Sequence, residues 1–214
     1  MGSENHAKVG IIFDWENYWA LEYTSGPNRD LRYVDQIEQM YNYFYNKNIA
    51  VDMIPIDADF SKYDLVAAPV LYMVKDGVAE RLEAYVQAGG TLITTYMSGI
   101  VGQSDNVHLG GYPGPLRKMA GVWVEEIDAL APEQRNKIRF ADGTEEECRL
   151  VCDLMHLEGA EEIAQYESDF YAGMTAVAKN QFGKGTVYYV GTELSESGLA
   201  KVLAMAADGA ASSR

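Results

Sequence analysis

The chain alternates short apolar segments with longer segments in which apolar residues recur every three or four positions. Short apolar runs are typical of buried strands, whereas the longer pattern is typical of amphipathic helices. Strands are predicted over residues 9–13, 49–54, 65–71, 91–95, 122–127, 137–140, 149–154, 176–179 and 187–190. Helices are predicted over residues 31–47, between Asp76 and Gly89, and over residues 195–207, with Asp30 and Asp76 as N-caps of the first two.

The order of these elements favours an α/β protein with a mostly parallel sheet, because strands and helices alternate through the first half of the chain. Gly183, Lys184 and Gly185 form a hairpin signal, which predicts an antiparallel addition near the C-terminus. The simplest division is one domain over residues 8–208. Residues 1–7 are interpreted as a tag or linker, and residues 209–214 as the remnant of a linker.

The composition is that of a folded domain with a strong acidic excess. Of the 214 residues 48% are hydrophobic, and 17 basic against 32 acidic residues give a net charge of −15. This charge repels phosphate backbones and anionic lipids, so neither a nucleic acid nor a membrane is expected as a partner. The sequence contains no apolar run of about 18 residues and no secretory signal pattern, which favours a cytoplasmic location.

Cys148 and Cys152 are the two cysteines. On one regular strand they would lie about 13 Å apart, too far for a disulfide. Without a second pair of ligands they do not form a zinc site. Both are therefore predicted to be buried free thiols in a reducing compartment.

Several kinds of chemistry can be tested against the residues. The segment after the first strand, residues 14–19, carries two acids and no glycine, which excludes a phosphate-binding loop. Asp14 and Glu16 are the one pair that suggests glycosidase chemistry, although a capping or hydrogen-bonding role fits their spacing better. Ser98 follows a predicted strand and precedes Gly99, as in a nucleophile elbow, but the sequence shows no histidine placed to activate it. The histidines show no metal-ligand spacing.

An excess of aromatic residues remains. The chain has 15 tyrosines, and Trp15, Tyr18, Trp19 and Tyr23 gather just after the first strand. Three interpretations are open: a local core patch, a subunit interface, or one wall of a carbohydrate pocket.

Two segments, FDWENYWALE at 13–22 and GGYPGPLR at 110–117, are long and rich in aromatic residues. They resemble the middle domain of family 42 β-galactosidases. The sequence between them continues the resemblance, which covers about residues 8–208.

In that family the middle domain is the trimerisation domain, so the resemblance implies a non-catalytic assembly function. It also implies a three-layer α/β/α sandwich, flavodoxin-like and similar to class I glutamine amidotransferases. The catalytic glutamates belong to a preceding TIM barrel, and a small β domain follows. These two domains would be the partners of this chain, in a homotrimer that hydrolyses terminal β-galactosides.

The predicted interface, or active-site mouth, comprises Asp14, Trp15, Glu16, Asn17, Tyr18, Trp19 and Tyr112. Met97 stands where the similar amidotransferases carry a catalytic cysteine, and a thioether has no proton to lose. No catalytic residue, cofactor or metal is therefore expected. Two alternatives stay open: a free-standing, amidotransferase-like hydrolase that uses Ser98, and a small-molecule (sugar) binding module at the strand ends.

Overall fold

The computed structural model describes residues 8–24 and 27–212 of the chain. Residues 1–7, interpreted above as a tag or linker, lie outside the described residues. Five α-helices are described: α1 (Trp15–Tyr23), α2 (Tyr33–Asn46), α3 (Val78–Gln87), α4 (Arg117–Ala120) and α5 (Glu196–Ser212). The strands within the described residues are β1 (Val9–Ile12), β2 (Val51–Ile54), β3 (Leu65–Ala68), β4 (Thr91–Thr95), β5 (Val122–Ala129), β6 (Asn136–Phe140), β7 (Glu145–Leu157), β8 (Glu161–Tyr166), β9 (Thr175–Phe182), β10 (Gly185–Val190) and β11 (Thr192–Leu194).

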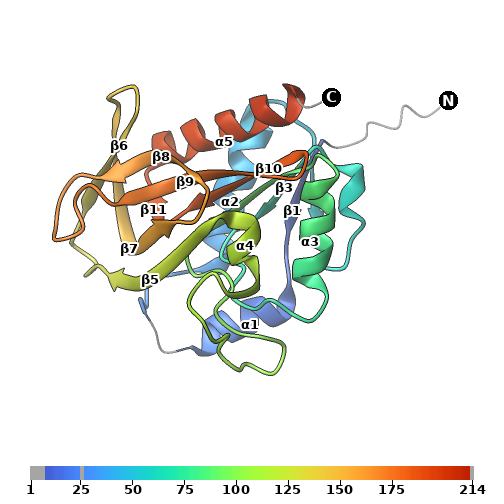
Figure 1. Cartoon of the computed structure of the whole chain (residues 1–214), viewed down its shortest axis with the longest axis horizontal. Coiled ribbons are helices and arrows are strands. Elements are labelled where there is room, and N and C mark those ends of the chain that lie inside the picture. Colours follow the sequence, from blue (N-terminus) through green and yellow to red (C-terminus); the bar gives the residue numbers. More distant parts are fainter. Residues whose placement is uncertain (1–7, 25–26, 213–214) are drawn as a thin grey trace.

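All of these strands join one mixed sheet (Figure 1). Its parallel half has the order β2-β1-β3-β4-β10, and β10 then pairs antiparallel with β9. From β9 onward every pairing is antiparallel, through β8, β6, β7, β5 and β11. The predicted antiparallel addition is confirmed. It is larger than predicted, however, and the sheet is mixed rather than mostly parallel.

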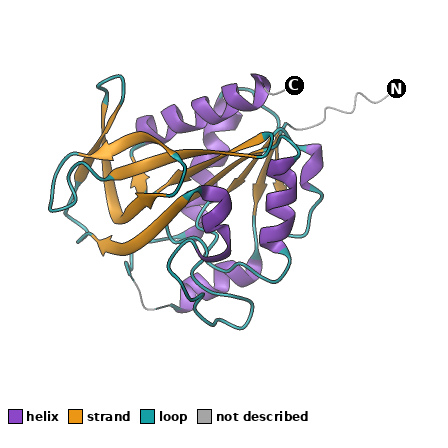
Figure 2. Ribbon diagram, in the orientation of Figure 1, coloured by secondary structure: helices purple, strands orange, loops and turns teal. Residues whose placement is uncertain are grey.

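Helices cover both faces of the parallel half (Figure 2). Successive side chains of a strand point to opposite faces. Ile11 of β1 accordingly packs with α2 and α5, whereas the next residue, Ile12, packs with α3 and α4. In β4, Leu92 and Ile93 divide between the two faces in the same way. Two apolar cores therefore hold the parallel half of the sheet, one on each face.

Both predicted N-caps are wrong. Helix α2 begins at Tyr33, so its N-cap position is Arg32 and Asp30 lies outside the helix. Helix α3 follows Gly77, whose left-handed backbone (φ 79°) occupies the cap position and displaces Asp76. A glycine adopts this conformation without steric cost, which is why the chain turns there rather than at the aspartate.

The pattern also misses four helices and strands: α1, α4, β8 and β11. β8 begins with two exposed glutamates and β11 has only three residues, so neither gives a clear apolar signal. The last helix runs further than predicted, to Ser212, because residues 204–211 are mostly alanine, the best helix former. Residues 209–212 therefore belong to α5 rather than to a linker. None of the described helices is long and apolar enough to cross a membrane.

Cys148 and Cys152 both lie on β7, buried and unbridged, as predicted. Their predicted separation is wrong, because β7 is not regular between them. Leu150 has a positive φ of 66°, and the pairing with β11 shifts register at this point. The irregularity brings the thiols together: the hydrogen bond with Cys152, with burial added, raises the pKa of the Cys148 thiol.

Candidate functional site

The carboxyl end of β1 leads directly into α1, where most of the predicted interface residues lie. Asp14 is the N-cap, and its Oδ1 accepts a hydrogen bond from the backbone N–H of Glu16 at 3.3 Å. The capping role predicted for Asp14 from the sequence is therefore confirmed. The Lys75 ammonium contacts both carboxylates, Asp14 Oδ1 at 2.9 Å and Glu16 Oε2.

These contacts decide the charge state of Lys75. Partial burial alone would lower its pKa, but the hydrogen bonds to Glu16 and Asp14 outweigh burial and raise the pKa above its ordinary value. Lys75 therefore stays cationic beside two acids. This arrangement fastens α1 to the loop after β3 and leaves neither carboxylate available as an isolated acid or nucleophile.

Asn17 fastens the inner side of α1. Its side chain is fully buried, its Nδ2 donates to the carbonyl of Val70 at 2.9 Å, and its Oδ1 accepts from the N–H of Met73 at 2.8 Å. A buried amide must satisfy both of its polar atoms, and here two loop backbone groups do so. Asn17 is thus a structural anchor and does not belong to the exposed surface.

The outer side of α1 carries an aromatic stripe. Trp15, Trp19 and Tyr23 follow one another at four-residue spacing, which places them on one helix face, and all three are exposed. Trp15 keeps 60% of its surface accessible and Trp19 keeps 52%. In an ordinary surface helix the apolar stripe faces the core. Here a buried asparagine faces the core and the aromatic residues face outward.

Trp15, the first residue of this stripe, packs edge-to-face against two neighbouring aromatic rings. The rings of Phe13 and Trp15 are 4.9 Å apart at 81°, and those of Trp15 and Tyr18 are 6.1 Å apart at 84°. Tyr18 itself is partly buried against the core and against Tyr33. The local-core interpretation is thus correct for Tyr18 and wrong for Trp15, Trp19 and Tyr23.

A shallow depression of about 300 Å³ borders the stripe. Trp19 and Tyr23 line it together with Met73 and Asp105, so the loop around residue 105 lies beside α1. That loop exposes two more apolar side chains, Val107 and Leu109. The outer side of α1 and this neighbouring loop are together called here the α1 face, defined by its exposed apolar residues Trp15, Trp19, Tyr23, Val107 and Leu109.

Tyr112 is placed differently from the other predicted interface residues. Its carbonyl accepts a hydrogen bond from the N–H of Val124 at 2.8 Å, and its side chain is half-buried between the two cores. It therefore joins the loop to β5 and is not part of the α1 face.

The turn after β4 has the backbone of a nucleophile elbow but lacks its chemistry. Met97, predicted to stand in place of a catalytic cysteine, has a positive φ of 57° and is buried. Ser98 is fully buried, where its Oγ accepts from the N–H of Leu71 at 3.0 Å and lies 2.9 Å from Thr94 Oγ1. A hydroxyl with these contacts and no exposed surface does not reach a substrate. The structure therefore disfavours the hydrolase alternative.

The loop before α4 covers this turn from outside. A Cβ on Gly99 would lie 1.9 Å from the carbonyl oxygen of Pro113, and a Cβ on Gly114 would lie 2.4 Å from that of Gly99. The two backbones are therefore in direct contact. A ligand cannot enter at the corner where related folds bind theirs.

A buried carboxyl, Asp153, lies in the interior of the antiparallel half. Burial raises its pKa to about 8, and the Tyr189 hydroxyl donates to its Oδ2 at 2.7 Å. With 1% of its surface exposed, it has no access to a substrate. In the described part of the chain, no three His, Cys, Asp or Glu side chains are grouped closely enough to hold a metal ion.

Comparison with known sequences places the chain in a family. The sequence model described as "Beta-galactosidase trimerisation domain" matches residues 7–212. Because this match covers nearly the whole chain, the protein belongs to the β-galactosidase trimerisation domain family.

Whole relatives are much longer. The chain is 51% identical over 202 residues to β-galactosidase LacZ of Lactobacillus acidophilus, covering 94% of this chain and 30% of the relative. It is 52% identical over 190 residues to β-galactosidase BgaA of Planococcus sp., covering 86% and 28%. The crystal structure of β-galactosidase from Bacillus circulans sp. alkalophilus superposes with a TM-score of 0.91 at 46% identity, covering 93% and 30%. The chain thus spans about 30% of the length of these relatives.

Sequence reasoning located the α1 segment but missed Lys75. This residue lies 61 positions from Asp14, and no local pattern marks it as a partner. That Trp15, Trp19 and Tyr23 share one helix face had a usable signal, since they repeat every four residues, but the spacing does not give the direction of that face.

Proposed function

We propose that this chain is the non-catalytic assembly domain of a β-galactosidase that hydrolyses terminal β-galactosides. The parent would carry its catalytic glutamates in a preceding TIM barrel and would end in a small β domain. Two observations support this proposal: the named relatives are β-galactosidases, and they are about three times as long as the matched segment. The buried Ser98 and the covered turn after β4 agree with a domain that has no chemistry of its own.

The outward aromatic stripe of α1 carries the proposal. Tryptophan and tyrosine are enriched at protein interfaces, and large apolar side chains grouped on a surface mark a binding face. We propose that the α1 face is buried in a homotrimer, against the barrel or the assembly domain of another subunit. A ring of three needs two different surfaces that meet head to tail, and the α1 face supplies one of them.

The position of the chain ends supports a contact with another subunit. β1 begins and α5 ends at the same end of the molecule, and α1 lies at the opposite end (Figure 1). Domains attached through the chain ends would therefore join the molecule away from α1. A neighbouring subunit can reach the α1 face, where Asp14, Glu16 and Trp15 would form part of the active-site mouth.

The finer fold assignment is also a proposal: a flavodoxin-like sandwich similar to class I glutamine amidotransferases. The order β2-β1-β3-β4-β10 of the parallel half supports it, as do the helices on both faces. The left-handed Met97 after β4 has the backbone expected of a degenerate nucleophile position. We further propose a cytoplasmic, reducing location, supported by the two free thiols.

The assembly proposal can be tested in the full-length parent enzyme by the double substitution Trp15→Ala and Trp19→Ala. An aromatic hot spot contributes about 2 kcal/mol or more, so losing one should weaken association about 30-fold and losing both about 1,000-fold. Sedimentation velocity across a concentration series measures this, together with galactoside hydrolysis. Phe170→Ala is the matched control, because Phe170 is an exposed aromatic residue outside the α1 face. Unchanged assembly and kinetics in the double variant would refute the proposal.

A further inference from the structure

A groove between α2 and the start of α5 lies apart from the α1 face. Its volume is about 600 Å³, within the size range of small-molecule sites. Gln39, Asn42, Tyr43 and Asn46 of α2 form one side, and Leu199 of α5 lies on the other. The assembly function described above uses none of these residues.

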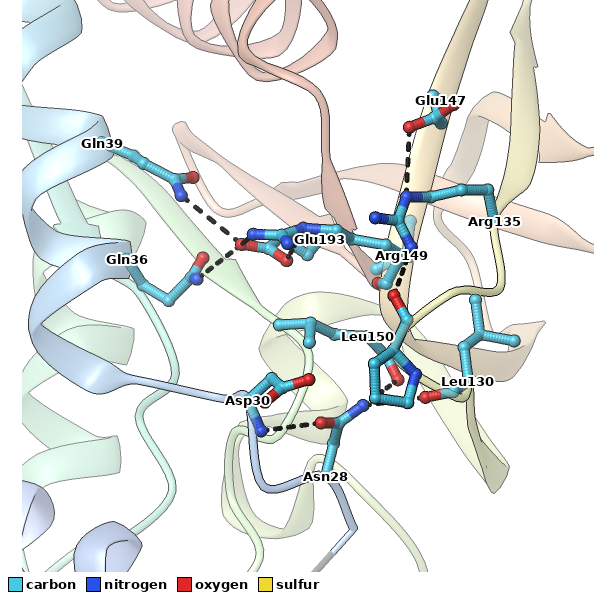
Figure 3. A network of polar contacts seen from close by, with 12 residues as sticks. Asn28, Asp30, Gln36, Gln39, Leu130, Arg135, Glu147, Arg149, Leu150 and Glu193 are labelled. Carbon is cyan, nitrogen blue, oxygen red and sulfur yellow. Dashed lines mark hydrogen bonds and ion pairs between the residues drawn. The ribbon is translucent and has the colours of Figure 1, made fainter.

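The lining of the groove includes an ion pair between Arg149 and Glu193 (Figure 3). Glu193, only 3% exposed, accepts from Gln36 Nε2 at 2.9 Å and from Gln39 Nε2 at 3.4 Å, and its Oε2 lies 2.8 Å from Arg149 Nε. A buried carboxylate is tolerated only with such partners. The pair therefore adds polar groups to the lining of the groove without adding net charge.

Arg149 keeps donor capacity on the groove side. Its side chain remains half-exposed and lines the groove; Nη2 donates to Glu193 Oε1 at 3.3 Å, and Nε lies 2.8 Å from Oε2 as an ion-pair contact. A guanidinium has five N–H donors, so part of this group is available to a ligand. Its charge is already compensated, which favours a neutral acceptor such as a hydroxyl over an anion.

Two side-chain amides form the adjacent wall. Asn42 and Asn46 are one turn apart on α2, so they share a face, and both are exposed. Each amide offers two donors and one acceptor. Tyr43, half-buried, and Leu199 add apolar surface between them. Hydrogen-bond donors and acceptors thus lie beside an apolar patch. This combination matches a sugar ring, which has hydroxyl groups at its edge and C–H groups on its faces.

The start of α5 does not make the groove an anion site. Ser195 Oγ already accepts from the N–H of Gly198 at 3.1 Å and donates to Glu146 Oε2 at 2.8 Å. The helix start is therefore capped by its own sequence. At the rim Lys47 and Glu196 oppose each other in charge, so the lining as a whole is close to neutral.

We propose that this groove binds a neutral saccharide. Hydroxyls of the sugar bond to Asn42, Asn46 and the free N–H groups of Arg149, and its apolar face packs on Tyr43. Because the groove is open and its polar groups are wet before binding, the Kd for a disaccharide should be about 1 mM.

The test is a titration of the ¹⁵N-labelled 214-residue chain with lactose, followed by backbone amide chemical shifts. Saturable shifts should appear in the second half of α2 and the first turn of α5. Galactose 6-phosphate, with its added charge, should bind no more tightly than lactose. The double substitution Asn42→Ala and Asn46→Ala, on exposed positions, should weaken lactose binding at least about tenfold.

Asn106→Ala is the matched control, because it removes an exposed amide from the loop beside α1. It should leave the lactose Kd unchanged, and thermal melts should show that all variants remain folded. The proposal is overturned if lactose causes no saturable shift up to 50-fold above the expected Kd. It is equally overturned if the shifts lie at the α1 face, or if the double variant binds as the parent chain does.

Discussion

β1 and β4 end at the same edge of the parallel half of the sheet. Two tryptophan side chains that follow β1 are exposed, whereas the side chains that follow β4 are buried. After β1, α1 turns Asn17 inward and exposes Trp15 and Trp19. After β4, the turn buries Tyr96, Met97 and Ser98, and the loop at Pro113 closes over it.

The difference shows that a strand end in this fold is accessible only where neighbouring segments leave it open. The turn after β4 has the sharp backbone that exposes a nucleophile in related architectures, yet packing has sealed it. The end of β1 has no such backbone, but its helix presents a large aromatic surface. In this molecule the accessible strand end therefore carries aromatic surface, and the Ser98 hydroxyl lies at the covered one.

The largest effect is expected from opening the sealed turn. Gly99→Ala should cost about 3–5 kcal/mol, because it combines a left-handed backbone (φ 66°) with overlap against Pro113. Urea unfolding of the isolated chain measures the loss. Gly143→Ala is the control: it has a φ of 84° but no neighbour within 4 Å, and should cost only about 1–2 kcal/mol. Equal losses in both variants would show that Pro113 does not seal the turn.

A second prediction concerns the interior close to that turn. Burial raises the pKa of Tyr96 well above its usual value, and the charges of Glu193 and Asp153 add to the rise.

The prediction concerns Asp153, which has a folded-state pKa of about 8, against about 3.9 when unfolded. The folded state therefore holds a proton that the unfolded chain releases, so stability falls as pH rises from about 4 to about 8.

Between pH 5 and pH 7 this linkage amounts to about 3 kcal/mol. Asp153→Asn cannot ionise, and it should remove this part of the pH dependence. Urea unfolding of both proteins at the two pH values gives the difference, in which other titrating groups cancel. If both proteins lose the same stability over this interval, Asp153 is already ionised in the fold.

A smaller loss is expected at the inner side of α1. Asn17→Ala leaves the carbonyl of Val70 and the N–H of Met73 buried without their partner, at about 2 kcal/mol. Differential scanning calorimetry measures the change, with the exposed Asn106→Ala as control. A loss below about 0.5 kcal/mol would mean that water replaces the amide and that α1 is loosely held.

The smallest effect is expected on the outer side of the same helix. Tyr23→Ala in the isolated chain should change the unfolding free energy by less than about 0.5 kcal/mol, since this ring is largely exposed. The same urea titration detects it. A loss comparable to that of Asn17→Ala would show that the stripe serves the fold rather than a partner, and it would weaken the assembly proposal.

The sequence predicted those parts of the fold where burial and periodicity coincide. Residues 91–95 were predicted as a strand and form β4 with the same bounds, because both of its faces are buried and every residue is apolar or β-branched. The family resemblance was also carried by local sequence, and the match over residues 7–212 confirms it.

The sequence could not show which aromatic residues are buried. Tyr18 and Trp19 are neighbours, yet one packs on the core and the other faces solvent. That outcome depends on where α1 begins, which Asp14, Lys75 and Asn17 fix together through residues more than 50 positions away. Likewise, no local signal predicts that the irregular strand at Leu150 brings Cys148 to Cys152.

The amino-acid sequence by itself thus determined the family, the parallel strands and the absence of a nucleophile at position 97. Tertiary structure decided which surface is exposed, because exposure depends on contacts between distant segments. The apolar pattern of a segment records how much of it must be buried, but only packing determines which side faces inward.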